Sequence, residues 1–167
     1  MAATSSGSAR VTLPTDEQIL ITRQFAAPKH LVYKAFTTPE LVKRWWHANR
    51  GEMTIAEIDL RVGGKWRYVM VGDDGIEVGF HGEYREIVPN ERVVSTEIYE
   101  GLPEGVSEEE GATVNTAMFT ETDGLTTLAI LVQATSKVSR DAIIESGMEA
   151  GLQDAMDLLE QAAVSLR

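Results

Sequence analysis

Residues 59–66 read Asp59-Leu60-Arg61-Val62-Gly63-Gly64-Lys65-Trp66 and join the end of one predicted strand to the start of the next. The pair Gly63-Gly64 supplies the positive φ angles that a tight turn between strands requires. Upstream of this turn stands Trp45-Trp46, and near the C-terminus one apolar-striped helix carries Gly147 and Gly151. Together these features predict a curved sheet that grips a helix and encloses a cavity.

An antiparallel meander of strands is predicted around this turn. From Glu52 to Ala134, apolar and polar residues alternate with the period of two that is typical of strands. Short turns such as Asp73-Asp74-Gly75 and Asp123-Gly124 separate these segments, and connections this short join antiparallel neighbours. One earlier strand is predicted over Glu17–Phe25. The strands predicted in the meander are Met53–Leu60, Lys65–Val71, Glu77–Val88, Arg92–Tyr99, Thr113–Glu121 and Leu125–Ala134.

Three helices are predicted beside these strands. Pro28 starts the first helix, which extends to about Phe36, because proline is tolerated in a first turn. Thr38-Pro39-Glu40 starts a second short helix, with Thr38 as its N-cap. The last helix is predicted from about Ser139 to Ser165. Its apolar stripe at helical spacing consists of Ile144, Met148, Leu152, Ala155, Leu159, Ala162 and Leu166.

The composition predicts one globular domain. The 167-residue chain is 43% hydrophobic, and a domain of this length buries roughly 70% of its unfolded surface, so it can form a core without disulfides. A disordered tail is predicted over residues 1–15, which are rich in Ala, Ser and Thr, and a single domain over residues 16–167. The chain has no cysteine, and its three histidines lack metal-ligand spacing. We therefore expect neither a metal nor a cofactor.

The charge and hydropathy of the chain argue against two kinds of partner. Its 15 basic and 26 acidic residues give a net charge of −11, which repels phosphate backbones and anionic lipid headgroups. No stretch of about 18 apolar residues is present, and residues 1–10 lack the apolar region of a secretory signal. We therefore expect a cytoplasmic protein that binds neither nucleic acid nor membrane.

Several motifs, in this order along roughly residues 17–165, resemble those of one protein superfamily. They are Phe25-Ala26-Ala27-Pro28, Thr38-Pro39-Glu40-Leu41 with Trp45-Trp46, Arg61-Val62-Gly63-Gly64-Lys65-Trp66, Gly82-Glu83-Tyr84-Arg85-Glu86-Ile87 followed by Pro89, and Ser146-Gly147-Met148 with Gly151. The chain resembles the helix-grip superfamily called START, SRPBCC or Bet v-like, and within it the branch named after the activator of the Hsp90 ATPase.

This resemblance implies an α+β fold in which a curved, seven-stranded antiparallel sheet wraps around the long C-terminal helix. It also implies two short helices after the first strand and a cavity between the sheet and the C-terminal helix. It brings no obligatory catalytic residue, so no catalytic residue is predicted.

Aromatic residues, methionines and glycines on facing elements are the candidates for lining this cavity. Trp45 and Trp46 point about 100° apart on a helix, so we expect one in the core and one near a cavity mouth. Each tryptophan or methionine also has the alternative of ordinary core packing. The candidates are Trp45, Trp46, Trp66, Tyr68, Met70, His81, Tyr84, Met118, Gly147, Met148, Gly151 and Leu152.

Three of these candidates have two specific interpretations each. Gly147 and Gly151 each cost about 1 kcal/mol in a helix interior relative to alanine. They either leave room for a ligand or allow a strand or the first helices to approach closely. His81 shares a strand face with Glu83 and Arg85. It is a titratable cavity group if that face is concave, and a solvated side chain if it is convex.

Three functions are compatible with this pattern. The first is a small soluble protein that binds a hydrophobic or amphipathic small molecule between sheet and helix. The second is a co-chaperone or stress-response domain like the Hsp90 ATPase activator. That activator carries an additional N-terminal domain, whereas in this chain about 15 residues precede the first predicted strand. The third, ranked last, is a cyclase- or hydratase-type enzyme using His81, Tyr84, Tyr68 and Glu97 as acids or bases. A monomer or a homodimer is expected.

Overall fold

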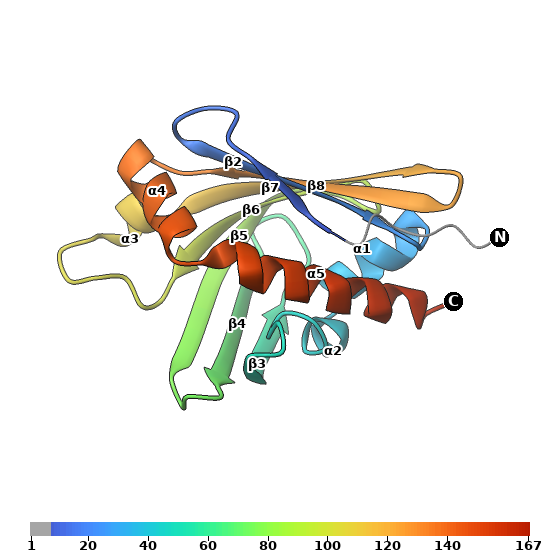
Figure 1. Ribbon diagram of the computed structural model, residues 1–167, viewed down its shortest axis with the longest axis horizontal. Helices are drawn as coiled ribbons and strands as arrows, with labels where there is room; N and C mark the ends of the chain where they lie inside the picture. The colour runs from blue at the N-terminus through green and yellow to red at the C-terminus, as the bar shows by residue number, and fades with distance from the viewer. Residues whose placement is uncertain (1–7) are drawn as a thin grey trace.

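The computed structural model describes residues 8–167. Its strands are β1 Arg10–Thr12, β2 Gln18–Phe25, β3 Gly51–Ile58, β4 Lys65–Gly72, β5 Glu77–Val88, β6 Arg92–Tyr99, β7 Thr113–Thr122 and β8 Leu125–Gln133. Its helices are α1 Lys29–Thr37, α2 Pro39–Val42, α3 Glu108–Gly111, α4 Lys137–Glu145 and α5 Met148–Val164. The strands form one antiparallel sheet in the order β1-β2-β8-β7-β6-β5-β4-β3 (Figure 1).

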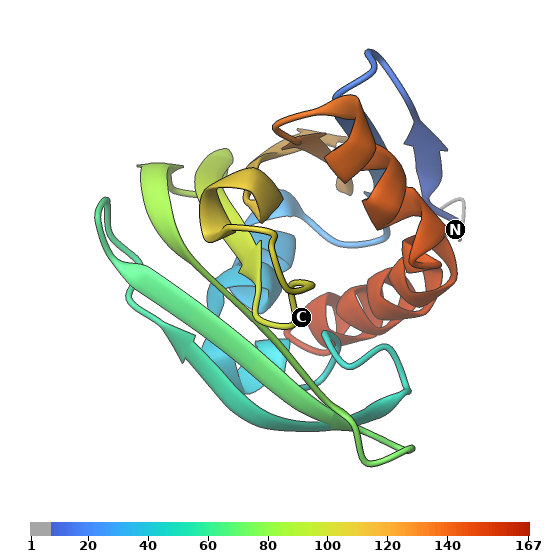
Figure 2. The same ribbon diagram turned by 90° about the vertical axis from the view of Figure 1, so that its left-hand side faces the viewer.

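The sheet is curved and partly surrounds the C-terminal helix. In Figure 1, α5 lies across one face of the sheet, and α1 and α2 lie beside its C-terminal half. Figure 2 shows β3, β4 and β5 bending away from β1, β2 and β8, so that the sheet wraps around the helical layer. This arrangement confirms the predicted α+β helix-grip fold. Within residues 8–167, however, the sheet has eight strands and not the seven expected.

The additional strand lies where a disordered tail was predicted. β1 pairs with β2 in the register Arg10↔Thr22 to Thr12↔Leu20, and Ala9 beside it is buried. The tail prediction is therefore wrong for these residues, because a three-residue strand is too short to display an alternating pattern. Residues 1–7 of the predicted tail lie outside the described residues.

The predicted single C-terminal helix is two helices. Gly147, between α4 and α5, has a φ of +81°, a left-handed conformation that interrupts a right-handed helix. α4 begins earlier than predicted because Ser136 caps it, its Oγ accepting a hydrogen bond of 3.1 Å from Ser139 N. Gly147 therefore terminates one helix and redirects the chain into the next.

The core lies between α1, α5 and the inner face of the sheet. Its largest fully buried side chains include Phe25, Phe119, Leu128 and Leu159, the last from α5. A second, smaller cluster contains Ala9, Ile19, Ile21 and Val132 under the start of α5. Among residues 8–167, no helix is long and apolar enough to cross a membrane.

Candidate functional site

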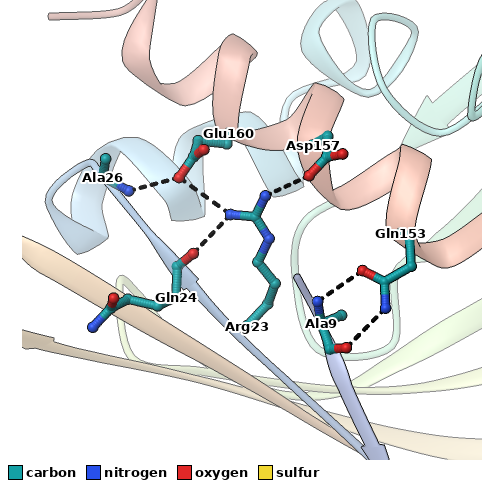
Figure 3. Close-up of polar contacts among 7 residues, drawn as sticks. All are labelled: Ala9, Arg23, Gln24, Ala26, Gln153, Asp157 and Glu160. Carbon is teal, nitrogen blue, oxygen red and sulfur yellow. Dashed lines mark hydrogen bonds and ion pairs between the residues drawn. The ribbon is translucent and has the colours of Figure 1, made fainter. Parts of the chain in front are cut away.

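Polar contacts fix α5 to the β1–β2 edge of the sheet (Figure 3). The guanidinium group of Arg23 is buried on the inner face of β2; its Nη2 lies 2.6 Å from Asp157 Oδ1 and its Nη1 lies 3.1 Å from Glu160 Oε2. Gln153 exchanges two hydrogen bonds of 2.8 Å with the backbone of Ala9. These contacts position the helix over the sheet and leave the opposite side of α5 to face β3–β6.

Aromatic side chains cover the inner face of β4 and β5. The ring of Trp46, which follows α2, lies 5.6 Å from that of Tyr68 and 5.5 Å from that of Phe80. Trp66 lies 4.7 Å from Tyr68, and its Nε1 donates to Thr96 O at 3.2 Å. Trp66 and Tyr68 are buried, whereas Trp46 and Phe80 keep part of their surface accessible. We call these four side chains (Trp46, Trp66, Tyr68 and Phe80) the aromatic wall. Trp66 and Tyr68 are its buried part, and Trp46 and Phe80 are its partly accessible part.

The double-glycine turn positions this wall. Gly63 N donates to Tyr84 O at 2.8 Å, and Tyr84 N donates to Gly64 O at 2.9 Å, so the turn is paired with β5. Trp66 lies across Gly82, where an added Cβ would come within 1.8 Å of Thr96 O and 2.6 Å of Trp66 Nε1. Only glycine at position 82 permits this close packing.

A cluster of polar side chains lies beside the aromatic wall. The Tyr68 hydroxyl donates a hydrogen bond to Tyr84, and burial raises the pKa of both phenols. Burial also raises the pKa of Glu97 to about 7, although a hydrogen bond from the Asn115 side-chain amide opposes that rise. Asn115 Oδ1 in turn accepts a hydrogen bond of 2.9 Å from Thr113 Oγ1.

The register of β6 directs Glu97 to the inner face of the sheet. Glu97 has the same parity as Val93, which is part of the main core, and it pairs with the buried Thr113 of β7. Glu97 is enclosed strongly enough for desolvation to dominate its pKa, yet it keeps intermediate accessibility to solvent. The carboxyl group of Glu97 therefore lies on the inner face of the sheet, with part of the residue's surface still accessible.

Open space also adjoins α5 at Gly151. Ala155 and Leu158, four and seven residues further along the helix, share its face and pack against the main core. Among the described residues, and apart from the backbone of its own helix and its chain neighbours, an ideal Cβ on Gly151 would nevertheless have no heavy atom within 4 Å. The close backbone approach that was one interpretation of this glycine is therefore absent.

Two predicted cavity residues lie on the outer face of the sheet. His81 Nδ1 is 2.9 Å from Glu100 Oε2, and Arg67 Nη2 is 2.8 Å from Glu100 Oε1. Hydrogen bonds from Arg67 and His81 hold the pKa of Glu100 down to about 2. Met118 is exposed, with its Sδ 3.8 Å from Arg92 Nη1. The cavity assignments of His81 and Met118 are wrong, because β5 and β7 turn these positions outward.

The remaining candidates occupy three different environments. Trp45 is buried, donating to Ala35 O at 3.0 Å and stacking on Phe36, whereas Leu152 packs against both core clusters. Gly147 is exposed at the helix break, and Met148 packs against the smaller cluster. Met70 lines a surface pocket of about 450 Å³ that also contains Arg50 and Asp73. Gly147 and Trp45 therefore do not line a cavity.

Three residues of the site were not predicted as lining residues: Glu97, which the sequence offered only as an acid or base of an enzyme, Phe80 and Asn115. Phe80 shares its strand face with Gly82 and Tyr84, so strand parity could have identified it. Asn115 carried no sequence signal. Within the part of the chain that the structure describes, no three His, Asp or Glu side chains are arranged to hold a metal ion.

Comparisons with known proteins agree with this architecture. The family model described as "Activator of Hsp90 ATPase homolog 1-like protein" matches residues 26–163. A crystal structure of a Rhodobacter sphaeroides protein is 25% identical with a TM-score of 0.84, covering 96% of this chain and all of that one. A solution structure from Arthrobacter aurescens is 22% identical with a TM-score of 0.81, covering 93% of this chain and 91% of that one. A crystal structure from Chromobacterium violaceum is 25% identical with a TM-score of 0.76, covering 89% and 98%. No curated protein matches the sequence significantly.

Proposed function

Because the chain belongs to the family of activator of Hsp90 ATPase homolog 1-like proteins, we propose that it binds a hydrophobic or amphipathic small molecule between α5 and the inner face of β4–β7. The observation that carries this proposal is the open space beside Gly151, on the helix face that otherwise packs against the core. Gly151 is half-buried, and a ligand seated beside it would complete the close packing that protein interiors normally show.

The side chains around this face suit an amphipathic ligand. Trp46 and Phe80 offer partly accessible aromatic surface, and Glu97 offers a polar group at the same inner face. Ligand sites are mostly apolar, with a few polar groups that fix the orientation of the ligand. The inner face of this sheet has that composition.

Native mass spectrometry of the purified protein, with and without denaturation, tests the proposal. We expect either a retained small molecule that leaves only on unfolding, or binding from a panel of lipids and aromatic compounds. Gly151→Leu fills the open space and should weaken binding about tenfold or more, whereas Ala150→Leu, on the exposed side of α5, should leave it unchanged. A clean apo mass together with no binding across the panel would refute the proposal.

A second candidate function is a protein interaction like that of the Hsp90 ATPase activator. The description of the family supports it, and so do the apolar residues Val62 and Ile76, which are 63% and 62% exposed on two hairpin turns. The test is the ATPase rate of purified Hsp90 with and without this protein. We expect stimulation that the variant Val62→Ser/Ile76→Ser reduces; an unchanged rate and no co-purification would exclude this function.

A further inference from the structure

We propose that the ligand carries a protonated amine, which Glu97 binds as a carboxylate while the aromatic wall contacts the apolar part of the ligand. This inference rests on the proposed small-molecule function and specifies its substrate class. The geometry that supports it is an inward-facing carboxyl group that has no ion-pair partner among residues 8–167 and lies near Tyr68, which packs against Trp66.

The first argument is the missing counter-charge. Within residues 8–167 the structure gives Glu97 no ion-pair partner, although it gives one to Glu86, Glu100 and Glu160. Buried carboxylates are expensive unless they are paired with a cation. A ligand cation would supply the charge that the protein does not.

The second argument is the unused hydrogen-bonding capacity of this carboxyl group. An ionised carboxylate accepts about four hydrogen bonds. In the described chain, the Asn115 amide is the hydrogen-bond partner of Glu97, and the Oδ1 of that amide is oriented by Thr113. The Tyr68 hydroxyl donates to Tyr84 instead. Acceptor positions on Glu97 are therefore available to an ammonium group, which carries three donors.

The third argument is the character of the surroundings. The groups that interact or pair with Glu97 are Tyr68 of β4 and Asn115 and Thr113 of β7, and Tyr84 of β5 is the hydrogen-bond partner of Tyr68; none of these is cationic. Glu108, Glu109 and Glu110 of α3, which packs against β6, add negative charge. Aromatic faces attract cations, and the −11 chain repels anions. Each contribution favours a cationic ligand over an anionic one.

Three aromatic compounds of matched size distinguish the possibilities: 1-naphthalenemethylamine, 1-naphthalenemethanol and 1-naphthoate. Their affinities are measured by isothermal titration calorimetry at pH 8.0 and pH 5.5. We expect the amine to bind about tenfold more tightly than the alcohol at pH 8, with 1-naphthoate weakest. The preference for the amine should shrink to about threefold or less at pH 5.5, where Glu97 is protonated and its carboxylate charge is lost.

Glu97→Gln supplies the matched variant, because it keeps the shape of the side chain and removes its charge. We expect this variant to bind the alcohol as the wild type does and to lose the preference for the amine at both pH values. Glu83→Gln, on the exposed face of β5, is the control and should change neither affinity.

The outcomes separate the inference from the function on which it rests. If the alcohol or 1-naphthoate binds as well as the amine at pH 8, the amine inference is wrong and the small-molecule function stands. If the amine preference persists in Glu97→Gln, Glu97 is not its binding group and the inference is likewise wrong. If none of the three compounds binds to the wild type, the amine inference is wrong, whereas the small-molecule function falls only if native mass spectrometry also shows a clean apo mass and the panel of lipids and aromatic compounds gives no binding.

Discussion

The two sides of α5 meet the sheet in different ways. Toward β1 and β2, the helix is held by the ion pairs of Arg23 and by the paired hydrogen bonds of Gln153. Toward β3–β6, the same helix presents Gly151, where an added Cβ would meet no neighbouring element within 4 Å, and among residues 8–167 the facing strands carry Glu97 without an ion-pair partner. The comparison teaches that polar contacts along one edge can hold a helix firmly enough for its other edge to remain partly unpacked.

Removing Arg23, whose ion pairs hold α5 to β2, should have the largest effect on stability. Arg23→Ala leaves the carboxylates of Asp157 and Glu160 without their cation and should cost about 3 kcal/mol of unfolding free energy. This is the low end for a buried pair, because the side chains of Asp157 and Glu160 are 50% and 22% exposed. Urea unfolding measures the loss.

Arg61→Ala is the control for this experiment. Arg61 pairs with Asp59 at 2.8 Å, but both side chains are well exposed, so the change should be below about 1 kcal/mol. Equal losses in the two variants would show that burial does not distinguish these ion pairs.

On the β3–β6 side of α5, which we call the open side, Glu97 should make the stability of the protein depend on pH. Its pKa rises from an ordinary 4.5 to about 7 in the folded protein, so the folded state retains a proton that the unfolded chain has released. Stability attributable to this group therefore falls as pH rises from 4.5 to 7 and stays low above that. Glu97→Gln should be more stable than the wild type by about 2 kcal/mol at pH 8 and equally stable near pH 4.5. A difference in unfolding free energy that does not change with pH would contradict this account.

Alanine substitutions at Gly147 and Gly151 should give smaller changes in the unfolding free energy, and the two changes should have opposite signs. Gly151→Ala adds a methyl group where no atom lies within 4 Å and should raise the unfolding free energy by about 1 kcal/mol, because alanine favours the helix. Gly147→Ala places a side chain at a φ of +81° and should lower it by about 1 kcal/mol. Thermal unfolding of both variants measures the contrast, and a loss of stability in Gly151→Ala would show that the space beside it is not available.

The helices and strands could be predicted because in most of them apolar residues recur with a single clear period, either that of a strand or that of a helix. The strands β5 and β6 have the bounds that alternation predicts, and the Gly63-Gly64 turn joins β3 to β4 with Asp59 N donating to Lys65 O across it, although of the two glycines only Gly63 has the predicted positive φ. β1 was missed because three residues show no period, and Gly147 was assigned to a helix interior because an apolar stripe continues across it. A left-handed glycine between two helices leaves the apolar stripe intact, so residue spacing alone cannot distinguish it from a glycine inside one continuous helix.

The site was harder to predict because its face depends on the curvature of the whole sheet. In β6, the residues Val93, Ser95 and Glu97 point inward, although Val94 and Ile98 on the other face are equally apolar in sequence. The same ambiguity placed His81 and Met118 inside. Glu97 was considered as an acid or base, but its burial and its contact with Asn115 depend on strand pairing that no local pattern reveals.

The smallest effect is expected at the ion pair on the open side. Arg50 Nη1 lies 2.8 Å from Asp154 Oδ2, with the two side chains 45% and 47% exposed, and Arg50 also lines the surface pocket beside Met70. Water and salt screen such a pair, so Arg50→Ala should lower the unfolding free energy by less than about 1 kcal/mol. If this contact restrains the open side of α5, the variant should also release a bound ligand faster in stopped-flow measurements, most clearly at low salt, while Arg61→Ala should not. An Arg50→Ala loss as large as that of Arg23→Ala would mean that both sides of α5 are anchored alike, and the contrast between them would be wrong.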